Sequence, residues 1–84
     1  MYKILIESNA EKDTNKLDKI SFERVIKNIL KLSNEPRPMG CKKLKDSVND
    51  WRIRVGDYRV IYDINDDNKE IRIMRVRHRR EAYR

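Results

Sequence analysis

The sequence predicts a small α+β domain in which two helices pack on one face of an antiparallel sheet. Three observations support this fold class. An apolar stripe with helical spacing occupies the first half of the chain, strict alternation of apolar and polar residues occupies the second half, and only two glycines and two prolines interrupt 84 residues. We therefore expect residues 1–84 to form a single domain, built as strand, helix, helix and a three-stranded antiparallel meander.

The first half of the chain contains one predicted strand and two predicted helices. Residues 2–7, YKILIE, form a short β-favouring run, and residues 9–17 predict a short helix with few apolar positions. Residues 21–33 predict a stronger helix with Ser21 as its N-cap. Five apolar residues follow the spacing of one buried stripe: Phe22, Val25, Ile26, Ile29 and Leu30.

A proline- and glycine-containing segment, residues 34–40, ends this helix because both residue types oppose helical continuation. Residues 41–50, CKKLKDSVND, form a basic connection without a clear period. Within it we expect Lys42, Lys43 and Lys45 to lie in a loop that contacts RNA; an ordinary exposed loop is an equally good interpretation.

Two alternating segments, residues 51–55 and 58–64, flank the joint Gly56-Asp57 in the second half. Glycine at the first central position suits a tight hairpin turn. On the first strand Trp51, Ile53 and Val55 share one face, so two arginines, Arg52 and Arg54, share the other. On the second strand, Arg59 lies opposite the apolar face that Val60 and Tyr62 occupy.

Residues 65–68, NDDN, predict the next turn, and residues 70–77, EIRIMRVR, predict the last strand of the meander. Its alternation slips around Met74-Arg75, which indicates a β-bulge or a strand end.

Positive charge is abundant and unevenly placed. The formal net charge is +7, and residues 71–84 contribute six arginines against one glutamate, or +5 of that total. A surface that serves only solubility mixes its signs. The imbalance favours a polyanionic partner, with nucleic acid first and an acidic membrane or protein second.

A single cysteine, Cys41, excludes an internal disulfide scaffold and a zinc site of the usual several-ligand kind. The N-terminal apolar run is too short for a signal peptide, and no stretch approaches the ~20 apolar residues of a membrane span. We therefore expect a cytoplasmic protein without a membrane partner.

The segment RVRHRREAYR, residues 75–84, surrounds the only histidine with arginines. Cleavage of RNA without a metal needs a proton acceptor for the 2′-hydroxyl, a proton donor for the leaving 5′-oxygen, and fixed cations for the phosphate oxygens. Arginine suits the last task because its planar fork binds phosphate bidentately. Histidine changes protonation near neutral pH, so His78 is the candidate acid or base, and Tyr83 can orient a phosphate or stack on a base.

Two motifs together, LKDSVNDWRIRVGDYRVIYDI and VRHRREAYR, resemble the RelE/ParE toxin superfamily, and specifically its RelE-type members. Those are toxins of type II toxin–antitoxin systems that cut messenger RNA on the ribosome. The similarity covers nearly the whole chain, and the two motifs together are more specific than either alone. It implies a RelE-like fold, a metal-independent endoribonuclease that uses the RNA's own 2′-hydroxyl, and no cofactor. It also implies two partners, a cognate antitoxin protein and the ribosome with messenger RNA in its A site.

The resemblance also implies roles for particular residues. The positions that bind and activate the scissile phosphate correspond to Arg52, Arg54, Arg59 and Arg79, and the nucleotide-placing tyrosine corresponds to Tyr83. The neighbouring Arg77 and Arg80 are expected to bind RNA.

This chain departs from the pattern in three respects. Arginines replace the lysines of the best-known member at 52 and 54, and a guanidinium is a poor general base, which leaves His78 as the replacement. Arg77 occupies the position of the usual glycine. No room remains for a C-terminal helix after Tyr83.

Other interpretations of the same residues remain open. The arginines can form a solvated strand face and tail, His78 can be an ordinary surface histidine, and Trp51, Tyr58 and Tyr62 are more typical of a core and its rim. Two further functions fit the same fold: a ParE-like inhibitor of DNA gyrase, and a non-catalytic nucleic-acid-binding protein. In either case the expected antitoxin is an acidic, partly helical chain that covers the basic surface.

Overall fold

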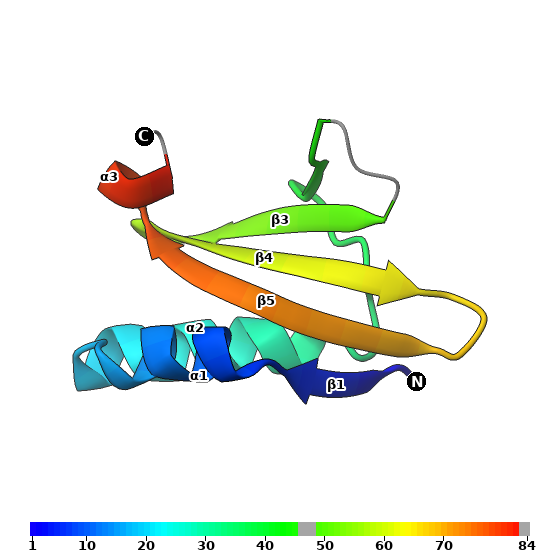
Figure 1. The fold of residues 1–84 in the computed structure, drawn as a ribbon, viewed down its shortest axis with the longest axis horizontal. Helices are drawn as coiled ribbons and strands as arrows, with labels where there is room; N and C mark the ends of the chain where they lie inside the picture. Colours follow the sequence, from blue (N-terminus) through cyan, green and yellow to red (C-terminus); the bar gives the residue numbers. More distant parts are fainter. Residues whose placement is uncertain (46–48, 83–84) are drawn as a thin grey trace.

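The computed structural model describes residues 1–45 and 49–82, shown in Figure 1. Its elements follow in the order β1 (Lys3–Ile6), α1 (Ser8–Asn15), α2 (Lys19–Lys31), β2 (Lys42–Lys43), β3 (Asp50–Val55), β4 (Tyr58–Asn65), β5 (Glu70–His78) and α3 (Arg79–Ala82). The predicted strand, two helices and meander are confirmed. No helix in the described part of the chain is both long and apolar enough to cross a membrane.

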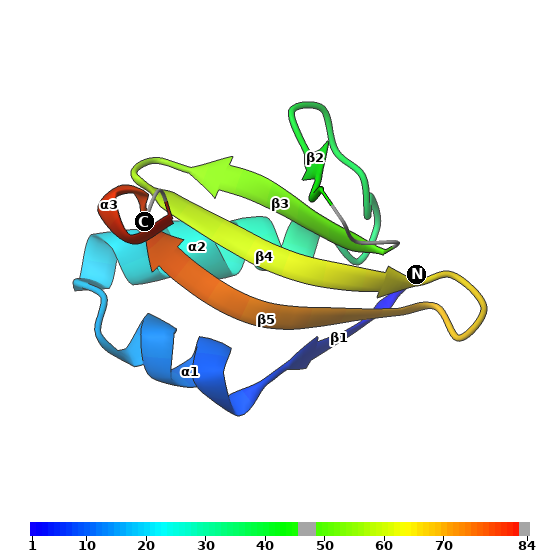
Figure 2. The same cartoon turned by 45° about the horizontal axis from the view of Figure 1, so that its top comes forward.

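The meander β3–β4–β5 forms the centre of a larger sheet with the strand order β1-β5-β4-β3-β2 (Figure 2). β1 adds to one margin and runs parallel to β5, with Ile4 opposite Ile71. β2 adds to the other margin, with Lys42 opposite Arg52 and Lys43 opposite Trp51. The expectation of an irregular loop at Lys42 and Lys43 was therefore wrong: two residues are too few to show a period, and the pairing with β3 makes them a strand.

The helices divide unequally between the two sides of the sheet (Figure 1). α1 and α2 cover one face, and the short α3 lies on the other side, at the end of the sheet where β5 ends. The covered face contains the core, in which Val25 and Ile29 of α2 pack with Val60, Tyr62 and Ile73 of the sheet. We call the opposite side of the sheet the open face.

The α2 helix differs from its prediction in two details. It begins two residues earlier, because Asp18 rather than Ser21 is the N-cap; the Asp18 carboxylate accepts a hydrogen bond from the Ser21 amide at 3.1 Å. Its apolar stripe is also only partly buried. Ile29 is 1% exposed, whereas Leu30 is 60% exposed because it lies at the margin of the stripe, turned away from the sheet.

The β3–β4 turn confirms the predicted tight hairpin. Gly56 has a φ of 60°, the left-handed value that glycine adopts without strain and that a type II′ turn requires at its first central position.

A β-bulge in β5 confirms the predicted slip and decides which residues face the core. Ile73 pairs with Tyr62, but the next paired residue on β4, Ile61, lies opposite Arg75 rather than Met74. Because of this extra residue, Ile73 and Val76 both face the core although they are three residues apart. Arg77 therefore belongs to the open face, and His78 belongs to the face that the helices cover. Arg75 has the register of the open face, but its guanidinium reaches Asp13 of α1 at the margin of β5.

Candidate active site

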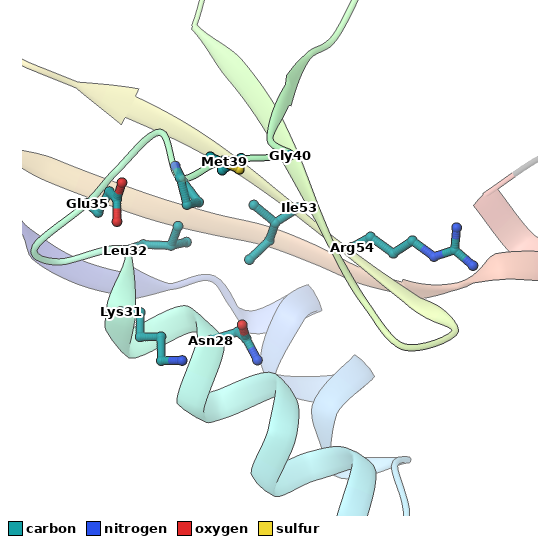
Figure 3. Close-up of a pocket in the computed structure, with 9 residues that line it drawn as sticks. Asn28, Lys31, Leu32, Glu35, Met39, Gly40, Ile53 and Arg54 are labelled. Carbon is teal, nitrogen blue, oxygen red and sulfur yellow. The ribbon is translucent and has the colours of Figure 1, made fainter.

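Alternation along β3 separates apolar and basic side chains cleanly. Figure 3 shows Ile53 pointing toward Leu32 of the helix layer, whereas Arg54 extends in a different direction, away from that residue. Ile53 is 7% exposed and Arg54 is exposed to solvent. Together with Leu32 and Met39, Ile53 lines a pocket of about 230 Å³ between α2 and the margin of β3. Arg54 and Lys31 also contribute to the lining of this pocket.

The basic residues of the open face gather around a second pocket, of about 240 Å³. Its charged lining comes from three strands: Lys42 of β2, Arg52 and Arg54 of β3, and Arg59 of β4. Gly40 and Ile53 complete the lining. We call this the cation pocket. It unites all three arginines predicted on the hairpin with one of the three lysines predicted to contact RNA.

Strand register extends this pocket into a row. Arg54 lies opposite Arg59 across the β3–β4 ladder, and Arg59 lies opposite Arg77 across the β4–β5 ladder. Three guanidinium-bearing residues therefore occupy directly opposed positions on three neighbouring strands, which we call the arginine row. Like charges at opposed positions destabilise a sheet, and a bound polyanion relieves that repulsion.

Arg54 is oriented by its own hairpin. Its Nε donates a hydrogen bond to the Gly56 carbonyl oxygen at 3.1 Å. The guanidinium thus keeps its position beside the turn while its remaining N–H groups can still meet a phosphate.

The open face changes sign along its strands. Toward the start of β3, Asp50 lies opposite Asp63, which lies opposite Arg72. Partial burial and the nearby carboxylates of Asp50 and Glu7 raise the pKa of Asp63, although Arg72 opposes the shift. An extended polyanion is therefore attracted to the end of the face that carries the arginine row and repelled from the other end.

His78 lies apart from the arginine row. Its ring meets the ring of Tyr58, with centroids 5.2 Å apart and an interplanar angle of 86°. Its Nδ1 accepts a hydrogen bond from the Arg80 backbone N–H at 3.2 Å. The bulge in β5 accounts for this placement. The structure brings Arg52, Arg54 and Arg59 together and places the His78 imidazole on the other side of the sheet.

The short helix α3 lies on the open-face side of the sheet and is hydrogen-bonded to the β3–β4 turn. The Arg79 backbone N–H donates to the Asp57 carbonyl oxygen at 2.6 Å, and the side chains of Arg79 and Arg80 are exposed. The sequence predicted no helix here, because a single turn is too short to show helical periodicity. Tyr83 lies outside the described residues.

Two other lysines were predicted to bind RNA, Lys43 and Lys45. Both are close to Lys42 in the sequence, but neither lines the cation pocket. Lys43 and Lys45 are both exposed, and Lys43 pairs with Trp51. Their role in RNA binding stays a prediction.

One carboxylate supports the strand that carries Arg77. Asp13 of α1 accepts hydrogen bonds from Arg75 Nε at 2.9 Å, Arg75 Nη2 at 3.2 Å and the Val76 backbone N–H at 2.9 Å. Partial burial alone would raise the pKa of Asp13, but these hydrogen bonds and the charge of Arg75 outweigh it and lower the pKa. The Asp13 carboxylate thus fixes β5 beyond the point where β1 stops pairing with it.

Among residues 1–45 and 49–82, no group of three or more His, Cys, Asp or Glu side chains is placed to hold a metal ion. The metal-independent mechanism predicted from the sequence stays a prediction.

Comparison with known proteins decides the family. Residues 4–83 match the family described as the ParE toxin of the type II toxin–antitoxin system parDE. The chain belongs to the RelE/ParE toxin superfamily. Toxin RelG of Mycobacterium tuberculosis is 30% identical over 84 residues, which cover 99% of this chain and 97% of RelG.

Solved structures agree with this membership. The archaeal RelE–RelB complex from Pyrococcus horikoshii contains a chain that is 31% identical, with a TM-score of 0.83 and coverage of 93% of this chain and 94% of that one. The toxin–antitoxin complex RelBE2 from Mycobacterium tuberculosis contains a chain that is 30% identical, with a TM-score of 0.82. The match covers 93% of this chain and 98% of that chain. The isolated RelE toxin of E. coli is 21% identical with a TM-score of 0.81, over 93% of this chain and 84% of that one, a similarity of fold.

One feature of the site was missed by sequence reasoning. Arg77 was expected only as a general RNA contact, whereas the register aligns it with Arg54 and Arg59. Counting the strand pairing outward from the Gly56 turn, and allowing for the bulge, would have found it.

Proposed function

We propose that this RelE/ParE-family toxin is an endoribonuclease that cuts messenger RNA on the ribosome, in the cytoplasm, by attack of the RNA's own 2′-hydroxyl on the adjacent phosphate. The cation pocket is the observation that carries the proposal. Four cations from three strands surround a volume of about 240 Å³ on a face that α1 and α2 leave uncovered.

The geometry supports a role in stabilising charge. In the transition state the phosphate gains negative charge on its equatorial oxygens, and preorganised guanidinium groups stabilise it more than they stabilise the ground state. Arg54 and Arg59 are the residues that we expect to contact these oxygens, with Arg52 and Arg77 on either side. The strand ladders hold their backbones fixed, so little reorganisation is needed when the phosphate reacts.

Proton transfer is the less defined part of the proposal. His78 stays the candidate acid or base predicted from the sequence, together with Arg79 and Tyr83 at the end of the chain. Its location beside Tyr58 means that a direct proton transfer requires the RNA to reach past the margin of β5.

The partner that silences such a toxin is expected to be a cognate antitoxin. Related chains have been solved in RelE–RelB complexes. An acidic antitoxin segment complements the arginine row in sign and would compete with RNA for it.

The test compares arginines of one sheet face. Arg54→Ala, Arg59→Ala and Arg77→Ala should each slow cleavage of a ribosome-bound message about 100-fold, measured by primer extension on translated messages. Arg59→Lys should recover only part of the rate, because it keeps the charge but loses the fork. Arg72→Ala is the matched control. Arg72 is also on β5 but pairs with Glu7, with Nε and Oε1 3.6 Å apart, and its loss should leave cleavage unchanged.

Three outcomes would contradict the proposal. If a variant with alanine at Arg54, Arg59 and Arg77 still cuts messages at the wild-type rate, these arginines do not form the catalytic site. Growth arrest with DNA damage and intact messages would favour inhibition of gyrase. Wild-type protein that neither arrests growth nor cuts RNA would favour a non-catalytic binding protein.

A further inference from the structure

A second basic pocket lies at the margin of β5, on the far side of Arg77 from the cation pocket. β1 stops pairing with β5 at Ile73, and beyond this point α1 packs against β5 instead. Between them lies a pocket of about 320 Å³ whose lining includes Lys16, Tyr58, Arg77 and His78. We call it the edge pocket. The function proposed above uses Arg77 and His78 of this lining, but it assigns no ligand to the pocket itself.

The two aromatic rings of this pocket form a corner. Tyr58 and His78 meet edge to face at 86°, and both residues are only partly buried. In such a T-shaped pair, a flat ligand can stack on the face of one ring while its edge contacts the face of the other. Nucleobases are bound in this way by aromatic side chains, with little dependence on sequence.

The charge around the rings favours an anion. Lys16, the C-cap of α1, and Arg77 of β5 both line the pocket. The carboxylate of Asp13 also lines it, but its charge is offset by the bidentate contact with Arg75. A cationic rim next to exposed aromatic rings suits a ligand with both a planar base and a phosphate, which is a nucleotide.

Arg77 connects the two pockets. On the open face it belongs to the arginine row, and it also lines the edge pocket. Two strand spacings, about 10 Å, separate β3 from β5, so the two sites lie within reach of neighbouring nucleotides of one extended strand.

We propose that the edge pocket binds one nucleotide of the RNA that flanks the cleaved bond, with its base against Tyr58 and His78 and its phosphate between Lys16 and Arg77. The proposal rests on the endoribonuclease function for its biological meaning, but the site itself can be tested alone. The chain would then hold its substrate around the margin of β5 rather than on the open face only.

The chain offers a direct probe, because His78 is its only histidine and gives a single imidazole Hε1 signal in a proton NMR spectrum. Wild-type protein is titrated separately with adenosine 5′-monophosphate, adenosine and inorganic phosphate at constant pH. We expect the monophosphate to shift the His78 signal upfield by its ring current, along a saturating curve. Adenosine should bind at least tenfold more weakly, and phosphate should produce no ring-current shift.

Variants test the contributions of charge and stacking. Lys16→Glu should weaken binding of the monophosphate at least tenfold, and its exposed position at a helix end keeps the core intact. Lys19→Glu, at the start of α2 and outside the pocket lining, is the matched control and should bind like wild type. Tyr58→Leu should abolish the shift; because Tyr58 also touches the core, its circular dichroism spectrum is compared with that of Tyr58→Phe, which should keep the shift.

Several outcomes would overturn the proposal. These are no shift with the monophosphate, equal affinity for phosphate and the monophosphate, or an unchanged affinity in Lys16→Glu. Failure of the proposed function looks different: wild-type protein would leave translated messages intact while the monophosphate still shifted the His78 signal.

Discussion

The two faces of the β3–β4 hairpin have opposite compositions although they alternate residue by residue. Val60 and Tyr62 are 0% exposed on the covered face, whereas Arg54 and Arg59 line the cation pocket on the other. The covered face stabilises the fold by burying apolar surface, and the open face concentrates like charge that a folded sheet does not need. Adjacent positions of one strand thus contribute to different properties. Substitutions on the covered face should change stability, and substitutions on the open face should change binding of an anionic partner.

The largest effect on stability should come from the helix that covers the core. Ile29→Ala removes a side chain that is 1% exposed and should lower the free energy of unfolding by about 3 kcal/mol. Leu30→Ala, at the next position, removes a side chain that is 60% exposed and should cost no more than about 0.5 kcal/mol. Urea denaturation of both variants measures the difference, and equal losses would mean that α2 is rotated relative to the sheet.

A smaller and pH-dependent effect is expected at the margin of β5. Asp13→Asn should lower the free energy of unfolding by about 1 kcal/mol at neutral pH, since a charged acceptor for Arg75 and Val76 is lost. The pKa of Asp13 is depressed in the folded state, so its contribution is present above the ordinary value of 3.8 and is lost as the pH falls through the lowered value. The stability difference between wild type and variant should therefore shrink below about pH 4. Asp67→Asn, in the exposed turn after β4, is the matched control and should leave the free energy of unfolding at neutral pH nearly unchanged.

The smallest effect on stability should come from the open face itself. Arg54→Gln should change the free energy of unfolding by less than about 0.5 kcal/mol, because its charge lies opposite Arg59. For its binding to single-stranded RNA, the slope of log affinity against log salt concentration should nevertheless become less steep by about 0.7. Arg72→Gln should leave that slope unchanged. An Arg54 variant that is clearly unstable but binds RNA normally would reverse the assignment of the two faces.

Local patterns were sufficient to predict most of the fold. Alternation in the hairpin and the glycine at position 56 predicted β3 and β4 to within a residue, and the slip at Met74-Arg75 predicted the bulge. These features depend on neighbours in sequence. The parallel pairing of β1 with β5 does not depend on neighbours in sequence, because it joins residues that are more than sixty positions apart. Nothing in the sequence of either strand identifies the other as its partner.

The site was predictable in part for the same reason. Arg52 and Arg54 follow from alternation alone, and their meeting with Arg59 follows from the hairpin. The placement of His78 could not be obtained this way, because one inserted residue in β5 exchanges the faces of everything after it. That insertion puts Arg77 opposite Arg59 and His78 opposite Tyr58, on the covered face.

The position of β5 also governs when the molecule can assemble. It follows the other strands in chain order, yet it lies between β1 and β4 and supplies Ile71 and Ile73, both fully buried. A nascent polypeptide that has not yet released this segment from the exit tunnel leaves β1 without its partner and the interior incomplete. Emergence of β5 is therefore the step that completes the folded core, and a message broken ahead of these codons yields no folded copy.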